Sequence, residues 1–152
     1  MKSNYAFVLK SIKKDKTLTP VLSNLKNKNY IVSGGTRGIG FNIAKKLAIQ
    51  GANVTIVGKT QQKHPKLSGT IFSAAEEICD LVKKPSCMGI PCDVRVEKEI
   101  DFAIREAIDV YVSIDGVILN ASALCLNNTI NQTSKEVELM SSVNIAGSYL
   151  FG

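Results

Sequence analysis

A glycine-rich segment near the start of the chain is the first group of residues whose spacing could do chemistry. It reads Ser33-Gly34-Gly35-Thr36-Arg37-Gly38-Ile39-Gly40, so three of its glycines follow a Gly-x-x-x-Gly-x-Gly spacing. Without side chains, such positions let backbone N–H groups approach an anion closely. The segment could therefore hold phosphate groups, although a glycine triplet alone is a weak signal and its setting must decide.

The setting is a strand followed by a helix. The apolar run 30–33 predicts a strand, and Ile39, Ile43, Ala44 and Leu47 then recur at helical spacing until Gly51. In this order the loop meets the positive end of a helix dipole, where a dinucleotide's pyrophosphate binds. One glycine then permits the turn, one lets the backbone approach phosphate, and one allows the helix to pack closely on the sheet.

The end of the second strand, Asn53–Val57, indicates which dinucleotide fits. A site for NAD carries Asp or Glu there, about 20 residues beyond the loop, to accept hydrogen bonds from the ribose 2′-hydroxyl. Here the position holds Gly58 and Lys59. Because Lys59 and Arg37 can neutralise a 2′-phosphate that a carboxylate would repel, the sequence favours NADP. The alternative for Lys59 is an ordinary exposed loop lysine.

The rest of the chain continues the alternation of strands and helices. We predict further strands over 88–92 and 116–119, with Pro91 weakening the end of the first of these. Helices are expected over 71–82, around 100–107, and from Ser134, which we expect to be an N-cap. The predicted fold is α/β, a Rossmann-type doubly wound parallel sheet of which about four strands, the first half, are present. Residues 25–152 would form this NADP-binding half-domain.

Charge and composition exclude several classes. The net charge is +6, but residues 1–28 hold seven lysines and one acid, Asp15, whereas residues 29–152 hold twelve basic and twelve acidic groups. A neutral body with a basic extension over 1–24 does not predict nucleic-acid binding. That extension faintly resembles a mitochondrial transit peptide, and a frayed terminus is the alternative. The most apolar stretch, 110–126, is broken by Asp115 and Asn120, so no membrane span is expected.

The cysteines do not indicate a metal site. No Cys-x-x-Cys pair occurs among Cys79, Cys87, Cys92 and Cys125, and His64 is the only histidine. The spacing therefore lacks the ligand pattern of a zinc site, and we expect reduced, mostly buried thiols.

Two further segments carry a resemblance. Cys92-Asp93-Val94 follows the third predicted strand, and Leu119-Asn120-Ala121-Ser122 follows the fourth. With the glycine loop, they make residues 25–152 resemble the short-chain dehydrogenases/reductases. The resemblance implies that residues 34–40 bind the cofactor, that Asp93 lies near the adenine, and that Asn120 and Ala121 frame the site. Leu119 and Ser122 depart from the family's Asn-Asn-Ala-Gly pattern.

A more specific resemblance covers residues 58–60, 64–71 and 74–78, which are similar to hydroxysteroid dehydrogenase-like members of that family. It makes His64 a loop residue. It implies an oxidoreductase that moves hydride between NADP(H) and a carbonyl or alcohol, with a small, lipid-like substrate. Such members are associated with peroxisomes and mitochondria; a cytoplasmic location is the alternative, and secretion is not expected. The complete protein is expected to form a homo-oligomer.

The family's catalytic residues are matched only in part. Val143-Asn144-Ile145-Ala146-Gly147 resembles the segment with its catalytic Asn, which makes Asn144 the candidate. The family's Ser and Tyr-x-x-x-Lys pair, which supply proton transfer and polarise the substrate oxygen, have no counterpart, because no tyrosine of this sequence has a lysine four residues later. We therefore expect the chain to be an incomplete and inactive piece of an enzyme. The alternative is a non-catalytic half-domain that binds a nucleotide or a partner.

Overall fold

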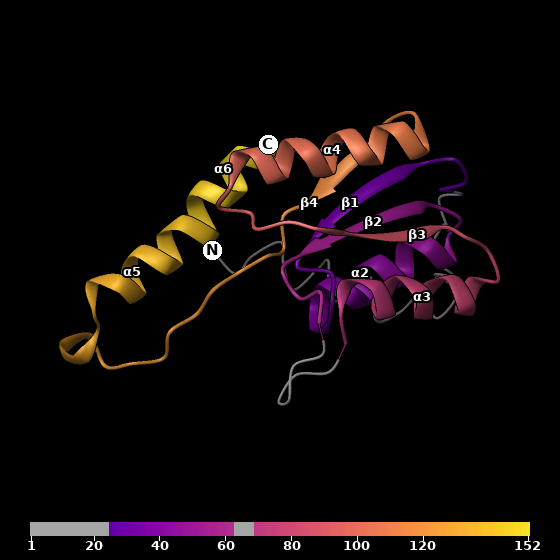
Figure 1. The fold of residues 1–152 in the computed structure, drawn as a ribbon. Coiled ribbons are helices and arrows are strands. Elements are labelled where there is room, and N and C mark those ends of the chain that lie inside the picture. The colour runs from indigo at the N-terminus through magenta and orange to yellow at the C-terminus, as the bar shows by residue number, and fades with distance from the viewer. Residues whose placement is uncertain (1–24, 63–68) are drawn as a thin grey trace, which may run out of the picture.

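The computed structural model describes residues 25–62 and 69–152, so the extension over 1–24 and His64 lie outside the described residues. The described chain forms one four-stranded parallel sheet with the strand order β3-β2-β1-β4 (Figure 1). The strands are β1 (Asn29–Ser33), β2 (Asn53–Gly58), β3 (Cys87–Pro91) and β4 (Gly116–Ile118). The α/β class and the parallel sheet are confirmed.

Helices cover both faces of this sheet. Figure 1 shows α2 (Gly38–Ile49) and α3 (Ile71–Val82) on one face and α4 (Glu97–Tyr111) and α6 (Gly147–Phe151) on the other. Successive strand residues point to opposite faces. Accordingly Val32 and Ile56 pack with α2 and α3, while the adjacent Ile31 and Val57 pack with α4 and α6. This burial on both faces explains why the strands read as uninterrupted apolar runs.

Most element bounds agree with the sequence patterns, and the differences lie at strand ends. Helix α3 spans the predicted residues 71–82, whereas β3 ends at Pro91, one residue before the predicted end. In the described part of the chain β3 is an edge strand, which tolerates proline because a ladder hydrogen bond on its outer side is not required. The fourth strand is only three residues long and ends before Leu119.

The last helical segment differs more from expectation. After a short turn η1 (Thr129–Asn131), α5 (Ser134–Ser141) continues through a π-helical turn η2 (Ser142–Ala146) into α6, and α5 projects from the body (Figure 1). The expected N-cap Ser134 is wrong. Thr133 is the cap, because its hydroxyl accepts from the Glu136 amide at 3.3 Å while the Glu136 carboxylate accepts from the Thr133 amide at 2.8 Å.

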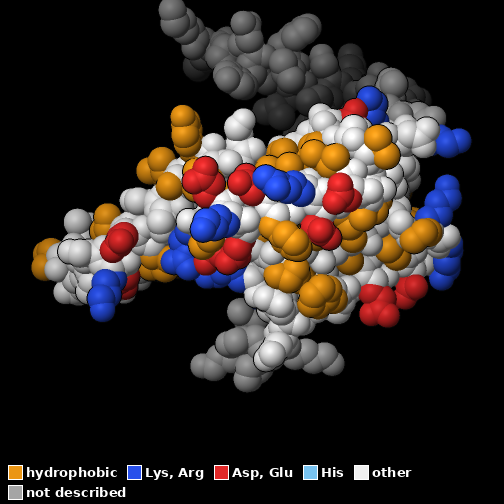
Figure 2. Space-filling model, turned by 45° about the horizontal axis from the view of Figure 1, so that its top comes forward, with side chains coloured by type: hydrophobic (Ala, Val, Ile, Leu, Met, Phe, Trp, Pro, Cys, Tyr) orange, Lys and Arg blue, Asp and Glu red, His pale blue; other side chains and the backbone are white. Residues whose placement is uncertain are grey.

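The surface of the described chain is mixed in character, and its cysteines are unpaired. Figure 2, which brings the α4 side of the molecule forward, shows acidic, basic and hydrophobic side chains interspersed. In the described part of the chain, none of the helices has the length and apolar character of a membrane span. All four cysteines are free thiols, with Cys87 and Cys92 buried and Cys79 and Cys125 half-buried.

Candidate functional site

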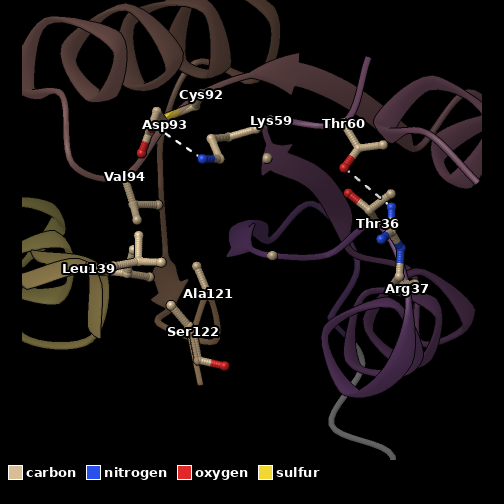
Figure 3. A pocket seen from close by; sticks show the side chains of 14 residues that line it. Thr36, Arg37, Lys59, Thr60, Cys92, Asp93, Val94, Ala121, Ser122 and Leu139 are labelled. Carbon is tan, nitrogen blue, oxygen red and sulfur yellow. Dashed lines mark hydrogen bonds and ion pairs between the residues drawn. The ribbon is translucent and has the colours of Figure 1, made fainter. Parts of the chain in front are cut away.

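A cavity of about 380 Å³ lies at the carboxyl ends of the strands, where the loops after all four strands meet the helix α5–η2. Parallel α/β sheets bind ligands at this edge. Figure 3 shows Arg37, Thr36 and Thr60 on one side of the cavity, Asp93, Val94 and Leu139 on the other, and Lys59 between them. The lining residues are Gly34, Thr36, Arg37, Gly58, Lys59, Thr60, Cys92, Asp93, Val94, Ala121, Ser122, Ala123, Leu139 and Val143.

Two glycines of the loop have clearly different duties. A methyl group on Gly40 would lie 2.4 Å from Asn120 Nδ2 and 2.5 Å from the Gly34 carbonyl oxygen, so helix α2 can approach β4 only without a side chain there. Gly38 has φ +60° and open space where its side chain would be. Because left-handed backbone favours glycine, Gly38 can begin α2 and leave the helix N-terminus uncovered.

Hydrogen bonds tie this loop to the end of β4. The Ser33 hydroxyl donates to the Ile118 carbonyl at 3.2 Å and accepts from the amides of Asn120 and Ala121, each at 3.0 Å. The Asn120 side chain in turn donates to the carbonyls of Ser33 and Gly34 at 3.0 and 3.2 Å. Asn120 and Ala121 therefore hold the shape of the loop, and the unusual Leu119 before them does not prevent it.

Arg37 reaches from the N-cap of α2 across to the loop after β2. One terminal nitrogen of its guanidinium donates to Thr60 Oγ1 at 3.2 Å and to the Gly69 carbonyl at 3.4 Å. Its Nε is buried and has no hydrogen-bond partner within the described residues. A buried donor without an acceptor is costly, so Nε is an unsatisfied group of this side chain among the described residues.

Lys59 and Asp93 line another wall of the cavity, and Arg95, which lies outside the lining, contacts Asp93. Arg95 binds the Asp93 carboxylate through Nε, at 2.9 and 3.1 Å from the two oxygens, and through its terminal nitrogen. Lys59 Nζ lies 3.4 Å from the same carboxylate. The side-chain hydrogen bonds from Arg95, above all, hold the pKa of Asp93 well below its ordinary value, so Asp93 is an anion at neutral pH.

The rest of the cavity is apolar or neutral. Val94, Leu139 and Val143 supply an apolar wall, the last two from one face of the helix formed by α5 and η2. Burial, and secondarily the carboxylates of Glu99 and Asp93, raise the pKa of the Cys92 thiol to about 12. Cys92 therefore stays protonated at neutral pH and is not a nucleophile.

Asn144 lies on the π-helical turn and contacts the site through Ala123. Its Oδ1 accepts from the Ala123 amide at 2.8 Å, and its Nδ2 donates to the Ala123 carbonyl at 3.0 Å. Both polar ends of the side chain are thus engaged with one backbone unit of the cavity wall. In this arrangement Asn144 positions the loop after β4, and π-helical turns are often found at functional sites.

The structure brings together about half of the residues expected at the site. Those that line the cavity are Gly34, Thr36, Arg37, Lys59, Asp93 and Ala121. Gly35, Gly38, Ile39, Gly40, Asn120 and Asn144 lie outside the lining; of these Gly35 and Gly40 are buried and Ile39 is 75% exposed. Sequence reasoning did not assign the apolar wall, although the i, i+4 spacing of Leu139 and Val143 places both on one helical face.

Comparisons with known proteins identify the family of this chain. The family short chain dehydrogenase matches residues 28–151. Hydroxysteroid dehydrogenase-like protein 2 of Mus musculus is 43% identical over 135 residues, which cover 88% of this chain and 27% of the mouse protein. The human protein of the same name is also 43% identical, and the match covers 31% of its length. The chain thus spans less than a third of these relatives.

Solved structures extend the comparison to the fold. A short chain dehydrogenase of Mycobacterium thermoresistibile is 36% identical with a TM-score of 0.74, over 84% of this chain and 45% of that one. Two more distant structures share the fold. A 3-ketoacyl-(acyl-carrier-protein) reductase of Brucella melitensis, named as complexed with NADH, has a TM-score of 0.69 over 84% of this chain and 48% of that one, at 22% identity. A metagenomic blue fluorescent protein, named as complexed with NADPH, has a TM-score of 0.70 over 84% and 49%, at 21% identity. This chain belongs to the short-chain dehydrogenase family.

Proposed function

We propose that residues 25–152 form the NADP-binding part of an oxidoreductase that acts on a carbonyl or alcohol. We favour NADP over NAD because two cationic side chains meet here: Lys59 at the end of β2 and Arg37 at the start of α2. Lys59 stands where an NAD site needs a carboxylate, and its side chain is 59% exposed beside the cavity. Arg37 adds a buried Nε that lacks an acceptor among the described residues.

The loop fits a dinucleotide as well as its 2′-phosphate. The uncovered N-terminus of α2 at Gly38 suits a pyrophosphate, and Lys59 and Arg37 suit the additional phosphate on the ribose. When bound, the cofactor would supply or accept the hydride. Asp93 and the frame made by Asn120 and Ala121 would hold the nucleotide end, as the resemblance implies.

Binding constants for the two cofactors test this proposal. We expect the chain to bind NADPH more tightly than NADH. Lys59→Ala and Arg37→Ala should each weaken NADPH by about tenfold, a loss of about 1.4 kcal/mol, and NADH by less than about twofold, because only NADPH carries the phosphate. Lys46→Ala, which removes an exposed lysine from α2, is the matched control. Equal losses for both cofactors in the Lys59 and Arg37 variants would contradict the phosphate-reading role.

The substrate is proposed from the family and from the apolar wall. Val94, Leu139 and Val143 beside the cofactor cavity suit a lipid-like molecule better than a charged one. We further propose that the 152 residues bind cofactor without turning over substrate, because the proton-transferring Tyr and Lys of the family have no match in them. NADPH oxidation with medium-chain ketones, followed by absorbance, tests this. Turnover by the 152-residue chain would contradict it.

The location and assembly proposed for the protein rest on the family resemblance. We propose residence in peroxisomes or mitochondria and a homo-oligomeric complete protein. Exposed apolar side chains on the α4 side, among them Phe102 and Val110, are compatible with further protein contacts. Imaging of the tagged endogenous protein and sedimentation of the purified one test the two points separately.

A further inference from the structure

Asp93 is an anion that borders a cavity proposed to receive a phosphate. Its side chain is only 15% exposed, and its carboxylate faces the same cavity as Lys59 (Figure 3). A carboxylate in this place should draw Lys59 toward itself and repel an incoming phosphate. The proposed preference for NADP therefore requires that the charge of Asp93 be neutralised by something other than Lys59.

Arg95 meets that requirement. Its guanidinium contacts both carboxylate oxygens of Asp93, and its backbone amide donates to Oδ1 at 3.1 Å. Such a paired arrangement is the strong form of a charge-assisted hydrogen bond. Lys59, at 3.4 Å and more than half exposed, makes a much looser contact. The neighbouring Glu99 carboxylate is engaged elsewhere, since it accepts from the Asp93 amide at 2.7 Å.

We propose that Arg95 determines cofactor specificity by occupying Asp93, which leaves Lys59 available to the 2′-phosphate of NADP. The inference rests on the proposed function and adds a positioning residue to it. Arg95 is not among the residues that line the cavity, so its effect passes through Asp93.

Loss of the Arg95 side chain should change the affinities for NADPH and NADH differently. Asp93 would then keep Lys59 as its cationic neighbour, and a closer pair would form between them at the expense of the phosphate. The freed carboxylate could also accept a hydrogen bond from a ribose 2′-hydroxyl, as the acidic residue of an NAD site does. NADPH should therefore bind more weakly, while NADH should bind as before or more tightly.

The experiment measures calorimetric dissociation constants of NADPH and NADH for the full chain at low salt. Arg95→Gln should weaken the binding of NADPH by about fivefold, the size expected for a partly exposed charge pair. The dissociation constant of NADH should stay within about twofold of the parent value or fall. Arg105→Gln removes the same charge from an exposed position of α4 and should leave both constants within about twofold. In an Asp93→Asn background, Arg95→Gln should have no selective effect, because no anion remains to be neutralised.

The outcomes separate this inference from the proposed function. If Lys59→Ala weakens the binding of both cofactors equally, the proposal that Lys59 recognises the 2′-phosphate is wrong. If Lys59→Ala is selective but Arg95→Gln weakens both cofactors equally, Arg95 serves only the loop structure and the inference alone is overturned. A selective loss that persists undiminished in Asp93→Asn would also overturn it, because the effect would not pass through Asp93. If Arg95→Gln does not fold, Arg95→Lys, which keeps the positive charge, is compared with the parent protein instead. This variant should keep most of the preference for NADPH over NADH, and loss of the preference would overturn the inference.

Discussion

Ser33 offers the sharpest test of how the fold builds its site. Ser33 is 2% exposed, and its one hydroxyl joins the end of β1 to three backbone groups at and just after the end of β4. Ser33→Ala removes the acceptor of two amides, those of Asn120 and Ala121, and the donor to the Ile118 carbonyl. These backbone groups are half-buried, so water can replace part of what is lost. At about 1 kcal/mol for each of three hydrogen bonds, we expect unfolding to become easier by about 2–3 kcal/mol.

Urea denaturation followed by circular dichroism measures this change. Ser142→Ala is the matched control, because its hydroxyl donates to the Leu139 carbonyl within a helix and should cost under about 0.5 kcal/mol. The affinity for NADPH should fall together with stability, since the glycine loop loses its attachment to β4. A Ser33→Ala protein within about 0.5 kcal/mol of the parent would refute the reasoning that this hydroxyl joins the two strand ends.

Three further predictions concern the cap of α5, the ionised state of Asp93 and the thiols. Thr133→Ala should lower the free energy of unfolding by about 1 kcal/mol and Ser134→Ala by much less, as measured by urea denaturation; the reverse order would restore Ser134 as the cap. The pKa of Asp93 is depressed below its ordinary 3.8, so the stability that its ionised form contributes is present above pH 4 and is lost as the pH falls further. The difference in unfolding free energy between the parent and Asp93→Asn should therefore shrink in acid. A difference that stays constant with pH would contradict this prediction. A maleimide at pH 8 should modify the half-buried Cys125 well before Cys92, whose thiol pKa is raised to about 12; equal rates by mass spectrometry would contradict this.

The fold was predictable because its signals are local. The helix over 71–82 is marked at its start by Thr70, whose hydroxyl accepts from the Ser73 amide, and its apolar face has a clear helical period. The buried strands were visible as apolar runs because both faces of each are covered. The glycine loop could be placed for the same reason: it lies between two elements that the sequence itself predicts.

The π-helical turn and the pairing of Arg95 with Asp93 depend on side-chain hydrogen bonds that the residue types alone do not disclose. The turn η2 interrupts a pattern that looks like an ordinary helix. Two serine hydroxyls donate to backbone carbonyls here: Ser142, at the start of η2, donates to Leu139, and Ser148, which follows in α6, donates to Asn144. Such bonds compete with helical geometry, but a serine in a sequence does not disclose that it forms them. Arg95 was missed although its partner Asp93 is only two residues away, because the role proposed for it concerns Lys59 on another loop.

The distribution of charge in the site shows why net charge was a poor guide to the ligand. Residues 29–152 hold equal numbers of acidic and basic groups, yet the cavity collects Arg37 and Lys59 from loops after two different strands. The parallel sheet brings these loops together because all its strands end at the same edge. The single acid that shares the cavity wall, Asp93, is bound by Arg95 from its own turn. A neutral body thus presents a locally cationic cavity, and the phosphate proposed to bind there would respond to these few side chains because charges beyond about 10 Å are largely screened.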